Sequence, residues 1–95
     1  MGATTVVELA PAIDAYDAAV AANDRILAAS RAQAIIDVVE SYGAANVTIN
    51  GKGVAGNPDT GLQDAWATVI GVWIKTLKDV IKFNAPVIAV PAFPG

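Results

Sequence analysis

The segment from Ala12 to Tyr42 contains neither glycine nor proline, and it constrains the fold more than any other feature of this chain. It is rich in alanine and lies between Pro11, which suits the first turn of a helix, and Gly43, which suits a helix end. The segment predicts either one helix of about 48 Å, from the rise per residue of an α-helix, or two helices hinged at Asn23 and Asp24. In the second case Asp24 would cap the second helix.

A seven-residue spacing of apolar side chains runs through the same segment. Its members are Ile13, Val20, Leu27 and Ala34. Such a spacing is typical of a seam against another helix. Asn23 and Arg31 weaken the seam, so the pattern favours a bent or broken helix pair over a long coiled coil.

The region 44–60 has the character of strands and turns. Val47-Thr48-Ile49 alternates and is followed by Asn50-Gly51, the dipeptide most typical of a tight hairpin turn. We therefore expect a short β-hairpin near 46–55. A lone hairpin is marginally stable in water, so it should lean on helices or pair with another strand. The N-terminal arm, residues 1–10, and the C-terminal arm both qualify as that strand.

Residues 61–83 predict one amphipathic helix. Its apolar stripe comprises Leu62, Trp66, Val69, Ile70, Trp73, Leu77, Val80 and Ile81. The opposite face is polar, with an acid early and lysines late, as the helix dipole favours. Thr60 and Gln63 have the spacing of a capping box. The helix should end near Phe83-Asn84, before Pro86.

The C-terminal arm, residues 84–95, carries three prolines and no charged side chain. Proline fixes φ and removes a hydrogen-bond donor, so this arm is expected to run extended and to lie in a groove of its own domain or of a neighbouring subunit. The residues predicted to contact a partner are Trp66, Trp73, Val87, Ile88, Val90 and Phe93. For the two tryptophans core positions are the favoured interpretation, because both lie on the apolar stripe; a tryptophan at the rim of the stripe would instead contact the partner.

Together these features predict a mainly α fold in a single domain, 1–95. It would be a small helical bundle of two or three helices, the first of them long and bent or else broken. The expected segments are the N-terminal arm 1–10, the helical segment 11–43, the hairpin and turn region 44–60, the helix 61–83 and the C-terminal arm 84–95.

Composition restricts the functions that this chain is expected to have. A net charge of −3 argues against broad electrostatic binding to nucleic acid. The chain has no cysteine and no histidine, which removes the thiolate nucleophile, the commonest general base and the commonest transition-metal ligand. No catalytic, cofactor or metal residues and no small-molecule substrate are predicted. No membrane span or secretory signal is recognisable, so localisation stays open.

Several short motifs resemble chemical sites but have simpler interpretations. Gly51 to Gly56 spells G-x-G-x-x-G, yet no helix is expected to begin within it as a dinucleotide site requires. Asp59-Thr60-Gly61 matches the triplet of aspartic proteases, but helix capping explains it. The acid pairs Asp14/Asp17 and Asp37/Glu40 could bind a cation or could form solvated helix faces.

The remaining alternatives concern assembly. Lys75, Lys78 and Lys82 form a basic stripe that is either an ordinary solvated face or a docking site for the acidic first quarter of another copy. With 55% hydrophobic and only 16% charged residues, the chain has more apolar surface than a small monomer covers easily. The sequence therefore predicts a non-enzymatic structural subunit that assembles with itself or with a larger structural protein. A virion decoration or coat protein and a filament subunit are the concrete forms, with virion or extracellular location; a small helical protein-binding or regulatory module is the alternative.

Overall fold

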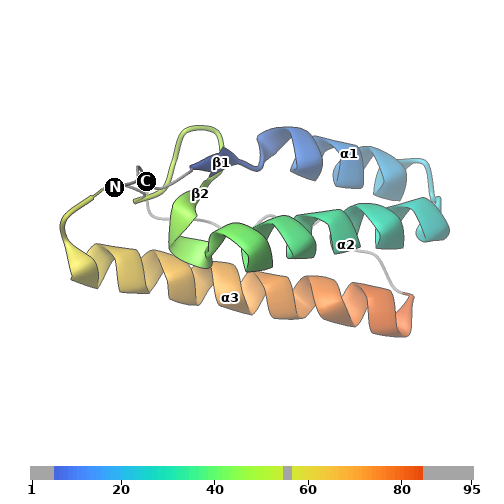
Figure 1. Ribbon diagram of the computed structural model, residues 1–95. Helices are drawn as coiled ribbons and strands as arrows, with labels where there is room; N and C mark the ends of the chain where they lie inside the picture. The colour runs from blue at the N-terminus through green and yellow to red at the C-terminus, as the bar shows by residue number, and fades with distance from the viewer. Residues whose placement is uncertain (1–5, 55–56, 85–95) are drawn as a thin grey trace.

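The computed structural model describes residues 6–54 and 57–84, and it confirms the mainly helical fold. The described residues form three α-helices, of which the first two are joined by a short connection and the last two by a longer segment, and a two-stranded sheet lies beside them (Figure 1). The described elements, in chain order, are β1 (Val7–Glu8), α1 (Ala10–Ala21), α2 (Arg25–Tyr42), the 3₁₀ turn η1 (Ala44–Asn46), β2 (Val47–Thr48) and α3 (Thr60–Phe83). The predicted C-terminal arm lies outside the described residues from position 85 onward.

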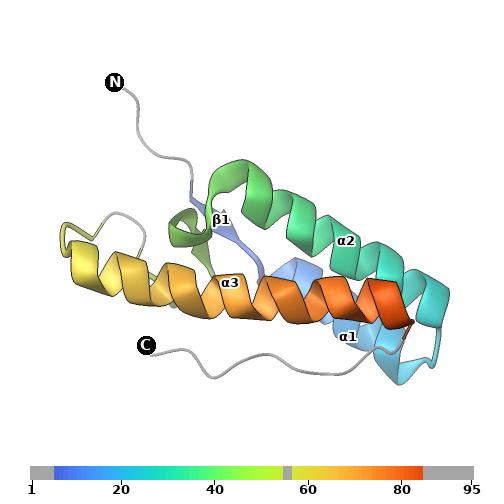
Figure 2. The same cartoon turned by 90° about the horizontal axis from the view of Figure 1, so that it is seen from below.

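Helix α2 is the central helix of the bundle. It packs against α1 and α3, whereas direct contacts between α1 and α3 are few (Figures 1 and 2). Consecutive helices run in opposite directions (Figure 1). The buried core joins all three helices to the sheet, and its bulkiest fully buried side chains are Trp66, Leu9, Ile35, Ile36, Ile70, Leu77 and Val47.

The break between α1 and α2 settles the alternatives for residues 11–43 in favour of two helices. Asn23 is left-handed, with φ of 57°. Its N–H donates to the carbonyl of Val20 at 2.9 Å, and the N–H of Asp24 donates to Ala19 at 3.0 Å. These two bonds form a Schellman ending. Asp24 then caps α2, since its carboxylate accepts from the N–H of Leu27 at 3.0 Å.

The predicted hairpin turn is present in a minimal form. Asn50 and Gly51 both have positive φ, 54° and 77°, as a type I′ turn requires. One antiparallel bridge closes the turn, with Ile49 and Lys52 exchanging both backbone hydrogen bonds at 2.8 and 3.0 Å. The turn is therefore as expected, while the ladder is only one bridge long.

The hairpin pairs with the N-terminal arm, one of the two predicted candidates. β1 and β2 are parallel, with Val7 opposite Val47 and Glu8 opposite Thr48. The N–H of Leu9 adds a further bond to the carbonyl of Thr48 at 2.8 Å. This pairing joins the segment before α1 to the segment between α2 and α3.

Helix α3 begins at Thr60, and its N-cap lies one residue earlier than predicted. Asp59, and not Thr60, is the N-cap: its carboxylate accepts from the N–H of Leu62 at 3.2 Å. The side-chain amide of Gln63 donates to the carbonyl of Asn57 and so holds the preceding turn. The capping-box prediction is thus wrong in detail, because an aspartate one position earlier supplies the same acceptor. The helix ends at Phe83 as predicted.

Candidate interaction surfaces

The two tryptophans predicted at an interface lie inside this chain. The exposed fractions of Trp66 and Trp73 are 1% and 4%. The indole N–H of Trp66 donates to the buried carbonyl of Val47 at 3.0 Å, which ties α3 to β2. The structure thus places both indoles where they fill the core. The other predicted interface residues, Val87, Ile88, Val90 and Phe93, lie outside the described residues.

Gly53 in the glycine-rich turn leaves room for the contact between Trp66 and Val47. Gly53 has φ of 149°, and a Cβ there would lie 2.9 Å from the carbonyl oxygen of Val47 and 3.3 Å from the ring of Trp66. Only glycine allows this close approach without displacing the backbone. Helix α3 begins at Thr60, beyond the glycines, so the turn lacks the helix start of a dinucleotide site.

Exposed apolar side chains lie on the outward face of α3. Leu62, Val72 and Phe83 are 50%, 63% and 65% exposed. They belong to a row spaced alternately by three and four residues, which we call the outer seam. Its members are Leu62, Ala65, Val69, Val72, Thr76, Asp79 and Phe83. Leu62 and Val69 were predicted on the inner stripe, and this second seam was not predicted, although the 3-4 spacing is its signal in the sequence.

A second apolar cluster lies at one end of the bundle. Ile26, at the start of α2, is 84% exposed, and its neighbour Leu27 is 38% exposed. Because α2 and α3 run in opposite directions, the start of α2 and Phe83 lie at the same end of the molecule (Figure 1). The last residue of the outer seam, Phe83, therefore lies at the same end of the bundle as Ile26 and Leu27.

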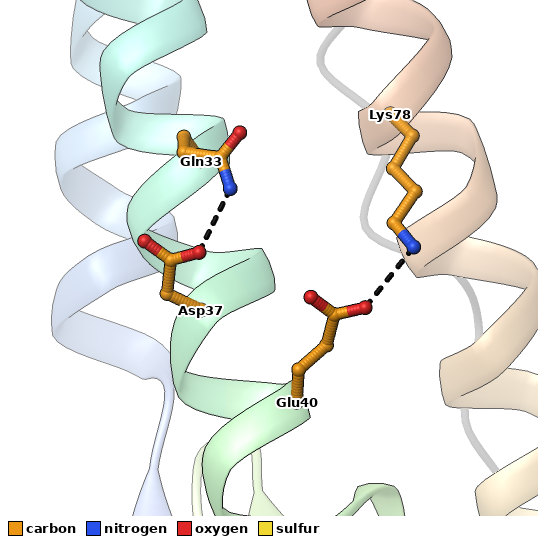
Figure 3. Close-up of polar contacts among 4 residues, drawn as sticks. All are labelled: Gln33, Asp37, Glu40 and Lys78. Carbon is orange, nitrogen blue, oxygen red and sulfur yellow. Dashed lines mark hydrogen bonds and ion pairs between the residues drawn. The ribbon is translucent and has the colours of Figure 1, made fainter.

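The lysines of α3 lie away from its first acids. Asp59 and Asp64 lie at its start, whereas the three lysines of the predicted basic stripe lie in its second half together with Asp79. Lys78 pairs with Glu40 of α2 at 3.1 Å (Figure 3). Both side chains are more than half exposed, so this ion pair contributes little to stability.

The two carboxylates of the predicted acid pair Asp37/Glu40 bond to different partners. Asp37 accepts from the side-chain amide of Gln33 at 2.8 Å, one turn earlier on α2, while Glu40 bonds to Lys78 (Figure 3). Within residues 6–54 and 57–84, no three potential ligands of the His, Cys, Asp or Glu type come together to hold a metal ion.

Glu8 is a polar junction that the sequence analysis did not identify. Its carboxylate accepts from the N–H groups of Asn50 and Gly51, both at 2.7 Å, and from the N–H of Ala10 at 2.9 Å. The hydroxyl of Thr48 donates to it at 3.3 Å. One carboxylate thus joins the start of α1 to the hairpin turn.

These contacts set the pKa of Glu8. Partial burial by itself raises the pKa of this carboxyl, but the hydrogen bonds from Gly51, Ala10, Asn50 and Thr48 outweigh it, and the net pKa is lowered. Asp17 on α1 is the opposite case. Burial, and secondarily the charge of Asp14, raise the pKa of Asp17, whose Oδ1 is buried and has no hydrogen-bond partner among the described residues.

No helix in the described part of the chain has the length and apolar character to cross a membrane. No known family model matches the sequence, and neither the curated proteins nor the solved structures contain a significant match.

Proposed function

We propose that this protein is a non-enzymatic structural subunit that acts by assembly, with itself or with a larger structural protein. A virion decoration or coat protein and a filament subunit are the concrete forms of this proposal. The observation that carries it is the outward face of α3, where Leu62, Val72 and Phe83 are at least half exposed although the inner face of the same helix already fills the core. A row of exposed apolar side chains along one helix face can form a contact with another protein.

The composition gives independent support. More than half of the residues are hydrophobic, and few are charged. A chain of this size buries only about 60–65% of the surface that its unfolded form exposes. Contacts between copies or with a host protein would cover part of the remaining apolar surface.

A protein-binding or regulatory module is the second candidate function, and the exposed Ile26 favours it. A single large aliphatic side chain that is 84% exposed at the end of a bundle can insert into a pocket of one partner. This alternative requires one defined partner and no self-assembly.

Light scattering across a dilution series of the purified chain tests the proposal. A structural subunit should show a defined oligomer or a growing polymer whose mass falls on dilution. A strict monomer at high concentration would exclude self-assembly. The remaining functions would then be a subunit that binds only a larger host protein, or the protein-binding module.

A further inference from the structure

We propose that two copies of this chain associate through the outer seam of α3, with the two α3 helices antiparallel. This inference rests on the proposed function and names its contact: a second copy of the chain on a stated surface. It uses the helix face that the fold of one copy leaves exposed.

The spacing of the seam fits a helix partner. Seven positions alternate in steps of three and four residues along the length of α3, which is the spacing of core positions in a coiled coil. The seam is apolar in the middle, at Val69 and Val72. Thr76 is compatible with it, because its hydroxyl already donates to the carbonyl of Val72 at 3.2 Å and its methyl group remains for packing.

The charges select the antiparallel orientation. In a parallel pair Asp79, the only charged member of the seam, would face Asp79 of the other copy, and the lysines of both second halves would lie together. Like charges at such positions are unfavourable. In an antiparallel pair, Lys75 and Lys82 approach the half of the other α3 that carries Asp64.

The same arrangement keeps the two Asp79 side chains apart. With the symmetry axis near Val72, each Asp79 lies opposite Ala65 of the other α3 and not opposite the second Asp79. The contact is also isologous, so a single surface closes the dimer by two-fold symmetry.

The first test is a charge placed in the middle of the seam. Val72→Glu brings two carboxylates near the symmetry axis, and we expect the dissociation constant of the dimer to rise at least about 10-fold. Val72 is 63% exposed, so the monomer should keep its helical circular dichroism. Ser41→Glu adds the same charge at an exposed position of α2 and is the matched control.

The second test determines the orientation. The chain has no cysteine, so Thr60→Cys and Thr68→Cys each provide one site for a spin label on α3. An antiparallel pair places the two Thr60 labels about 20 Å farther apart than the two Thr68 labels, given the rise per residue of an α-helix. In a parallel pair, the distance between the two Thr60 labels would nearly equal the distance between the two Thr68 labels. Pulsed electron–electron double resonance measures both distances.

The outcomes separate the inference from the proposed function. Weakened association of Val72→Glu only, with the unequal distances, supports the antiparallel seam. An oligomer that Val72→Glu leaves intact, or equal distances, overturns the inference while the structural-subunit proposal stands. A wild-type chain that remains a monomer at every concentration overturns the inference and the self-assembling form of the proposed function together.

Discussion

At the scale of single residues, the Glu8 carboxylate is the contact with the clearest consequence for pH. Its hydrogen bonds lower its pKa below the ordinary value of 4.5, so the folded chain holds this proton less tightly than the unfolded chain. The stability that it contributes is complete above that ordinary pKa and is lost as pH falls through the lower pKa of the folded state. Glu8 thus makes the junction between α1 and the hairpin turn sensitive to acid.

The substitution Glu8→Gln should lower the free energy of unfolding at pH 7 by about 1 kcal/mol, a value reduced for the exposure of the carboxylate to solvent. The difference from wild type should narrow in acid, where the wild-type carboxyl is protonated. Urea unfolding at neutral and acid pH measures both values. Glu40→Gln, which removes only an exposed ion pair, is the control and should change little. A Glu8→Gln effect that is equal at the two pH values would contradict this account.

At the scale of elements, the junction between α1 and α2 depends on a cap within a very short connection. Asp24→Ala removes the acceptor for the N–H of Leu27 and should cost about 1 kcal/mol of stability. Ser30→Ala, at an exposed position within the same helix, should not destabilise the chain, because alanine favours helix. Thermal unfolding of the two variants compares them directly. Equal melting temperatures would mean that water replaces the cap without loss.

Local signals in the sequence were sufficient for most helix ends. Pro11, Asn23-Asp24 and Asn84 each mark a boundary through backbone chemistry that acts within a few residues. The same holds for the Asn50-Gly51 turn, where positive φ is required at both positions. The existence and type of these elements were therefore predictable.

Contacts between distant segments were not predictable in the same way. β1 and β2 are two residues long, so neither shows a period, and their parallel pairing joins positions about forty residues apart. The carboxylate of Glu8 reaches across the same distance in sequence. The seven-residue spacing that continued through Leu27 and Ala34 is interrupted because Asn23 ends the first helix. Both of those side chains are exposed on α2.

The extent of the buried face of α3 also required the three-dimensional structure. A stripe at helical spacing shows that one face of α3 is apolar, but it does not show how wide a face the rest of the chain covers. The core covers Trp66, Ile70, Trp73 and Leu77 and leaves Leu62 and Val72 exposed. The candidate interface on α3 therefore moves from the indoles to the outer seam.

At the scale of the whole molecule, deletion of residues 85–95 distinguishes the two functions. The three prolines and the apolar side chains of this segment predict an extended arm that needs a groove. For a structural subunit, deletion should reduce the mass measured by light scattering and leave the helical circular dichroism unchanged. For a module whose arm folds back on its own domain, deletion should instead lower the melting temperature of the monomer.

The seam and the arm can be separated in one comparison, because they are different surfaces of the same subunit. If both form contacts between copies, Val72→Glu and the deletion should each leave smaller assemblies, and the combined variant should be monomeric, since independent contacts contribute separately to the free energy of association. Ser41→Glu combined with the deletion is the matched control and should behave as the deletion alone. A combined variant that assembles as well as wild type would place the contact elsewhere, and the exposed Ile26 at the end of the bundle would be the next residue to substitute.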